Sequence, residues 1–131
     1  MTYALDTNTL IYFFKRKGRV ADRLLAVAPA AIAVPAIVAY EINTGIAKSN
    51  QPEQLQQQFS ALLSVVRLLP FADREARHAA QVRATLERAG KPIGPMDTLI
   101  AGTALANGLV LVTHNTVEFS RVPGLQLADW F

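Results

Sequence analysis

Short apolar runs alternate with longer helical segments along the whole chain, and this alternation constrains the fold more than any other feature. Strands that alternate with helices form βαβ units, in which the strands run parallel and helices cover them. We therefore predict an α/β fold with three layers, in which a mostly parallel sheet of four to five strands carries helices on both faces. The predicted strands are Tyr3–Asp6, Ala31–Val34, Arg67–Phe71, Leu109–Thr113 and a short edge strand within Gly124–Trp130.

Single residues mark the ends of the predicted helices. Pro35 and Pro52 suit a first helical turn, Asp73 suits an N-cap, and Gly108 suits a helix end. The predicted helices begin at about Thr7 and further cover Val20–Val27, Ala36–Lys48, Pro52–Val66, the segment that runs from the Asp73 cap to Ala89, and the segment from Pro95 to Gly108.

The composition suits one domain without disulfides. The 131 residues are enough for one core and too few for two, so we expect a single domain over residues 1–131. The chain has no cysteine and its start lacks the features of a signal peptide, as expected of a cytoplasmic protein. The uncharged segment Leu24–Tyr40 is shorter than a membrane-spanning helix of about 20 residues and contains two prolines, so we expect no membrane span there.

The net charge of +3 permits binding to a polyanion without requiring it. Two groups of basic residues stand out, and a solvated helix end explains each as well as phosphate binding does. They are Lys15, Arg16, Lys17 and Arg19, and Arg83, Arg88 and Lys91.

Three acids and one amide lie where the predicted fold gathers polar side chains. Asp6 ends the first predicted strand, Asn115 follows a later one, and Asp97 lies in the first turn of a helix. In open parallel sheets, functional groups collect beyond the carboxyl ends of the strands, at the topological switch point. Glu41 lies mid-helix among apolar neighbours, and Gly45 on the same face leaves room beside it.

Each acid also has a structural explanation. N-capping is the better explanation of Asp6 in isolation, as is the helix dipole for Asp97. A buried salt bridge or a helix edge that reaches solvent explains Glu41 as well as a function does. The prediction of a site rests on the convergence of all three acids.

Carboxylates that meet at one point repel one another, and a divalent cation removes that repulsion. Oxygen ligands favour Mg²⁺ or Mn²⁺, whereas zinc sites use cysteine and histidine, and this chain has only His78 and His114. Such a centre suits phosphodiester hydrolysis, in which the cation activates water and neutralises the transition state.

Several motifs together resemble the PIN-domain toxins of the VapC family. They are LDTN at Leu5–Asn8, an in-helix YE at Tyr40–Glu41, the long block Pro92–Phe119 and VPGLQLADW at Val122–Trp130. The resemblance implies a PIN-like fold and a Mg²⁺- or Mn²⁺-dependent endoribonuclease, with structured RNA such as tRNA as the substrate. It also implies neutralisation by a cognate VapB-type antitoxin, a homodimer and a toxin–antitoxin hetero-oligomer.

The resemblance also assigns roles to individual residues. Asp6 and Asp97 match the acids that bind metal directly, and Glu41 matches a third, which acts as a ligand or through water. Asn115 departs from the commonest PIN pattern, which has aspartate at this position. Its carbonyl oxygen can orient water or ligate weakly, and Glu118 can supply the missing charge.

Two other interpretations stay open. An Asp-Thr-Asn-Thr turn after a first strand is also similar to aspartate-nucleophile phosphatases of the haloacid dehalogenase type, but these carry a second aspartate where this chain has Asn8. A non-catalytic interaction module on the same fold would use its acids for structure only.

Overall fold

The computed structural model describes all 131 residues and contains one five-stranded sheet. The strands are β1 (Tyr3–Leu5), β2 (Ile32–Pro35), β3 (Arg67–Leu69), β4 (Val110–Val112) and β5 (Leu127–Ala128). Their order across the sheet is β3-β2-β1-β4-β5, and every neighbouring pair runs parallel. The predicted parallel sheet is therefore confirmed, including the short edge strand near the end of the sequence.

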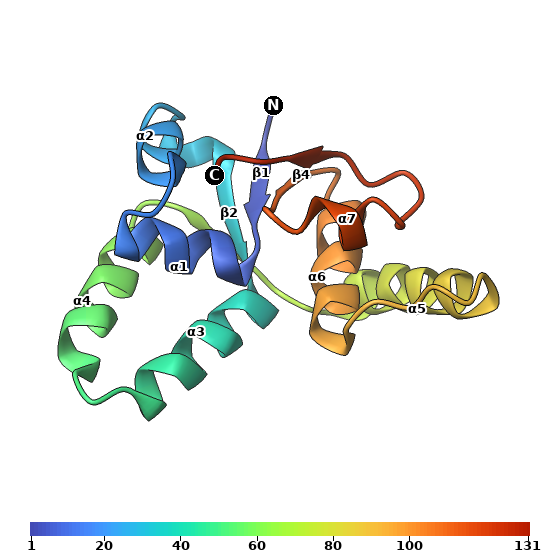
Figure 1. Ribbon diagram of the computed structural model, residues 1–131, viewed down its shortest axis with the longest axis horizontal. Helices are drawn as coiled ribbons and strands as arrows, with labels where there is room; N and C mark the ends of the chain where they lie inside the picture. Colours follow the sequence, from blue (N-terminus) through green and yellow to red (C-terminus); the bar gives the residue numbers. More distant parts are fainter.

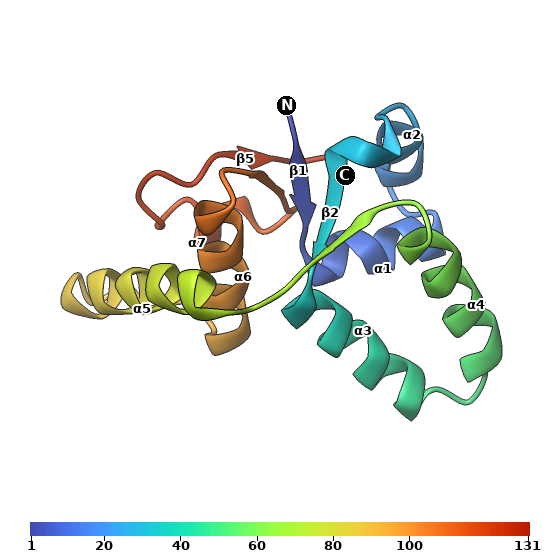
Figure 2. The same ribbon diagram turned by 180° about the vertical axis from the view of Figure 1, so that it is seen from behind.

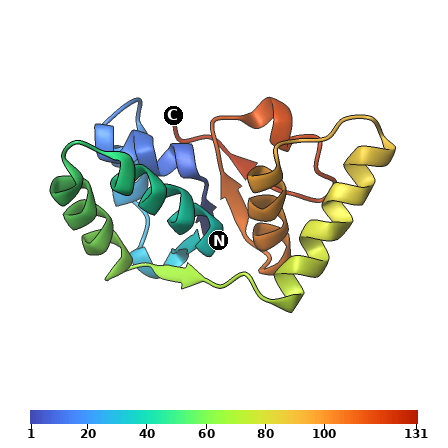
Figure 3. The same cartoon turned by 90° about the horizontal axis from the view of Figure 1, so that it is seen from below.

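Helices flank the sheet in two groups (Figures 1 and 3), which confirms the predicted layers. One group contains α1 to α4 and the other contains α5 to α7. Their bounds are α1 (Thr7–Lys15), α2 (Val20–Leu25), α3 (Ala36–Lys48), α4 (Pro52–Leu63), α5 (Asp73–Arg88), α6 (Pro95–Ala106) and α7 (Thr116–Phe119), with a short 3₁₀ turn at Pro29–Ala31.

The order of the strands creates a switch point between β1 and β4. The chain passes from β1 to β2 and β3 on one side, and the segment that includes β3 leads across to α5 (Figure 2). It then returns as β4 on the other side of β1. The connection that follows β1 therefore leads to one side of the sheet, and the connection that follows β4 leads to the other. Polar residues that follow β1 and β4 are thereby placed at one rim of the sheet.

Two predicted helix starts were wrong in detail. Pro35 is the last residue of β2, where it is paired in register with Leu69, and its extended backbone makes it the N-cap of α3. Asp73 is the first residue of α5 rather than its cap, because Ala72 occupies the cap position and donates its N–H to the Glu75 carboxylate at 3.0 Å. The Asp73 carboxylate instead forms an exposed ion pair with Arg77.

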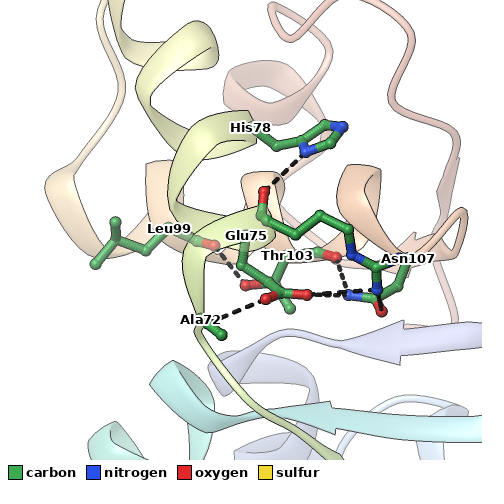
Figure 4. A network of polar contacts seen from close by, with 7 residues as sticks. Ala72, Glu75, His78, Leu99, Thr103 and Asn107 are labelled. Atoms are coloured by element: carbon green, nitrogen blue, oxygen red, sulfur yellow. Dashed lines mark hydrogen bonds and ion pairs between the residues drawn. The ribbon is translucent and has the colours of Figure 1, made fainter.

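A buried polar network joins the start of α5 to the end of α6 (Figure 4). Glu75 is only 3% exposed, and it accepts a hydrogen bond from the Asn107 amide at 3.2 Å. The same amide donates to the carbonyl of Thr103 at 2.8 Å. Because a buried acid needs partners, this network restricts how α5 can pack on α6.

None of the helices is both long and apolar enough to cross a membrane. The uncharged segment Leu24–Tyr40 is divided among the end of α2, the 3₁₀ turn, the buried strand β2 and the start of α3.

Candidate active site

Asp6 lies directly after β1 and is both an N-cap and a candidate ligand. Its Oδ1 accepts a hydrogen bond from the backbone N–H of Thr9 at 2.8 Å, so the capping role is real. The Thr9 hydroxyl in turn donates to the carbonyl of Val112 at 3.0 Å, which ties the cap to the end of β4. Burial raises the pKa of Asp6, and hydrogen bonds from Thr113 and Thr9 partly offset that rise. The cap uses Oδ1, and Thr113 is a further hydrogen-bond partner of this carboxylate.

Asp97 lies in the first turn of α6, at the same rim. Burial raises the pKa of this carboxyl to about 6, and the charges of Asp6, Glu118 and Glu41 add to the rise. Repulsion of this kind acts only between groups that lie near one another. Asp6, Glu118 and Glu41 therefore lie near enough to Asp97 for their charges to act on it.

Glu41 points from α3 toward the first turn of α1. The hydroxyl of Thr7 donates a hydrogen bond to its Oε1. The side chain is half-buried and lines a groove of about 240 Å³ together with Lys15 and Gly45. A Cβ added to Gly45 would meet no atom within 4 Å, so the predicted space beside the acid is present.

Asn115 and Glu118 form a pair at the start of α7. The Asn115 amide donates to Oε2 of Glu118 at 2.6 Å, and the Asn115 backbone N–H donates to the Thr113 hydroxyl at 3.0 Å. Asn115 occupies the N-cap position of α7, but its side chain makes no capping bond. The side-chain NH₂ of Asn115 is engaged by Glu118, and the side-chain oxygen Oδ1 is left for other partners.

The ligand atoms at this rim fit a hard divalent cation. They are carboxylate, hydroxyl and amide oxygens, which Mg²⁺ and Mn²⁺ favour. The two histidine rings face other partners, because His78 contacts the carbonyl of Arg74 and His114 pairs with Asp129. No three histidine, cysteine or acidic side chains lie close enough together to hold a metal ion as they are placed. A cation bound at this rim would therefore require these side chains to move closer together.

The structure adds two residues that the sequence had not singled out, Thr7 and Thr9. Both belong to the Asp-Thr-Asn-Thr turn after β1, and each contacts a different part of the site. The only sign of these two residues in the sequence was that they are hydroxyl residues close to a capping acid. Helix capping explains such residues without any site, so the sequence could not reveal their partners.

The raised pKa of Asp97 predicts a pH-dependent stability in the absence of cations. The folded chain binds this proton more tightly than the unfolded chain between pH 3.8 and about 6. The resulting stabilisation is present below that range and is lost as the pH rises through it. The raised pKa of Asp6 acts in the same direction.

We therefore expect Asp97→Asn to stabilise the cation-free chain above pH 6 and to flatten this part of the pH profile. Urea unfolding in EDTA across the range measures the effect. Identical profiles for the variant and the wild type would contradict it.

Comparison with known proteins agrees with the geometry. The PIN domain family matches residues 3–125. The chain is 35% identical to the tRNA(fMet)-specific endonuclease VapC of Salmonella typhimurium over 130 residues, which cover 99% of this chain and 98% of that relative. The chain belongs to the VapC family of PIN-domain proteins.

Two solved VapBC structures have a chain with the same fold as this one. DNA-bound VapBC from Salmonella typhimurium aligns with a TM-score of 0.93 at 35% identity, over 100% of this chain and 99% of that one. VapBC2 from Rickettsia felis, bound to a DNA fragment from their promoter, aligns with a TM-score of 0.92 at 34% identity, over 100% of both chains. The predicted PIN-like fold is confirmed.

Membership of this family argues against the aspartate-nucleophile phosphatase. Asn8, which stands where such phosphatases carry their second aspartate, has an exposed side chain. The acids whose charges act on Asp97 in α6 come instead from the end of β1, from α3 and from α7.

Proposed function

We propose that this chain is the toxin of a type II toxin–antitoxin system and acts as a Mg²⁺- or Mn²⁺-dependent endoribonuclease. One observation carries the proposal: Asp6 after β1, Asp97 in the first turn of α6 and Glu118 in α7 lie at the rim where β1 and β4 end, and burial together with the charges of Asp6, Glu118 and Glu41 raises the pKa of Asp97. A concentration of negative charge in a half-buried site is unfavourable unless a cation binds there.

Each residue of the proposed site has its own role. Asp6 and Asp97 hold the cation, and Glu41 completes its surroundings as a ligand or through water. When bound, the cation neutralises charge on the phosphodiester and makes water more acidic. Asn115 orients water or RNA through its carbonyl oxygen, because Glu118 engages its amide.

The proposed substrate is structured RNA of the tRNA class. The Salmonella relative carries the name tRNA(fMet)-specific endonuclease, and it aligns with nearly the whole of this chain. The net charge of +3 is compatible with a polyanionic substrate. An intracellular RNA also places the activity in the cytoplasm.

The proposed partner is a VapB-type antitoxin, because the two aligned structures are both VapBC assemblies. A homodimer of this chain within a larger toxin–antitoxin hetero-oligomer is the arrangement expected for the family.

The test is RNA cleavage by the purified chain, freed of antitoxin and incubated with cellular tRNA. We expect discrete fragments with Mg²⁺ or Mn²⁺ and intact RNA with EDTA, because the acids need the cation to bring the phosphodiester to them. Gel analysis of end-labelled RNA reads the result. Equal cleavage in EDTA would sink the metal-dependent mechanism.

A further inference from the structure

One contact at the site links two elements that the acids alone do not connect. The Thr7 hydroxyl donates to Oε1 of Glu41. Thr7 is the first residue of α1, directly after the Asp6 cap, whereas Glu41 lies in the second turn of α3. No other protein group donates a hydrogen bond to this carboxylate. The position of Glu41 relative to Asp6 therefore depends on Thr7.

Packing restrains Glu41 only in part. The side chain is half-buried and borders an open groove, and Gly45 leaves empty space on the same helix face. A glutamate in such surroundings samples several rotamers, and fixing it on a cation has an entropic cost. A hydrogen bond that selects one rotamer beforehand removes part of that cost.

We propose that Thr7 is a positioning residue for the metal site. By binding Oε1, it holds Glu41 at the rim and leaves Oε2 for the cation or for the water around it. The Asp-Thr-Asn-Thr turn then supplies two functions from adjacent residues, since Asp6 is a ligand and Thr7 orients a second acid. This inference rests on the proposed function.

The test compares three variants with the wild type. Thr7→Val removes the hydroxyl at nearly constant volume, and Thr7→Ser keeps it. Thr44→Val is the matched control, because it removes from α3 a hydroxyl that donates only to the Tyr40 carbonyl. Mn²⁺ affinity is measured by titration calorimetry, RNA cleavage by initial rates, and stability by thermal unfolding in EDTA.

We expect Thr7→Val to weaken Mn²⁺ binding by about 10- to 100-fold, as for other residues that orient metal ligands. Cleavage should fall through kcat rather than KM for RNA. Thr7→Ser and Thr44→Val should stay close to the wild type. In a Glu41→Gln background, Thr7→Val should have no further effect on Mn²⁺ affinity, because Thr7 acts through Glu41.

Wild-type Mn²⁺ affinity in Thr7→Val would overturn the inference, as would an equal loss in Thr7→Ser. A full additional loss in the Glu41→Gln background would also overturn it, because it would mean that Thr7 acts elsewhere. If the wild-type chain binds Mn²⁺ but cleaves no RNA, the proposed function fails while the titrations still decide the role of Thr7.

Discussion

Replacing Asp97 with asparagine is expected to reduce RNA cleavage by about 100- to 1,000-fold, because the cation that it helps to bind provides several kcal/mol of transition-state stabilisation. Asparagine keeps the shape of the side chain but loses the charge. The helix α6 should form normally, since its N-cap is Gly94 and Pro95 occupies its first turn. Initial rates on tRNA at saturating Mg²⁺, together with the growth of cells that express the variant, measure the effect.

The matched control is Asp73→Asn, which removes an aspartate charge from the first turn of a different helix. Asp73 is exposed and pairs only with Arg77, so its loss should leave cleavage unchanged. If Asp97→Asn retained full toxicity and full metal binding, the acids would serve structure only. The chain would then be a non-catalytic interaction module on the PIN fold.

Replacing Gly102 with alanine is expected to destabilise the fold by about 3 kcal/mol, at the upper end of overpacking effects. A Cβ added to Gly102 would lie 2.5 Å from backbone atoms of Ala79. Backbone cannot rotate away as a flexible side chain can, so α5 and α6 would have to separate. The thermal unfolding midpoint should fall by roughly 10 °C, as measured by circular dichroism.

Gly45→Ala is the control for this substitution. Gly45 also lies inside a helix, but an added Cβ there would meet no atom within 4 Å. Alanine at this position should stabilise the chain by about 0.5–1 kcal/mol through helix propensity. Equal tolerance of alanine at Gly45 and Gly102 would mean that α5 and α6 do not approach as closely as described.

The hydrophobic pattern and the residues typical of helix ends predict most of the fold, because both act locally. The apolar run of β4 and the acid that ends β1 are each visible within a few residues. The predicted helix starts were wrong where the role of a residue depends on which partner is hydrogen-bonded or paired in register. Pro35 reads as a first helical turn until its register with Leu69 is known, and Asp73 reads as a cap until Glu75 is seen to bind Ala72.

The sequence by itself determined the parallel α/β fold and the acids of the proposed site, since residue type and strand-end position are properties of the chain. The tertiary structure alone decided how those acids are held. Thr7 and Glu41, which are hydrogen-bonded, are 34 residues apart in the sequence. The Asn115 amide donates a hydrogen bond to Glu118, which the sequence had suggested only as a source of negative charge. The contact between Thr7 and Glu41 depends on how α1 packs against α3, which no local pattern encodes.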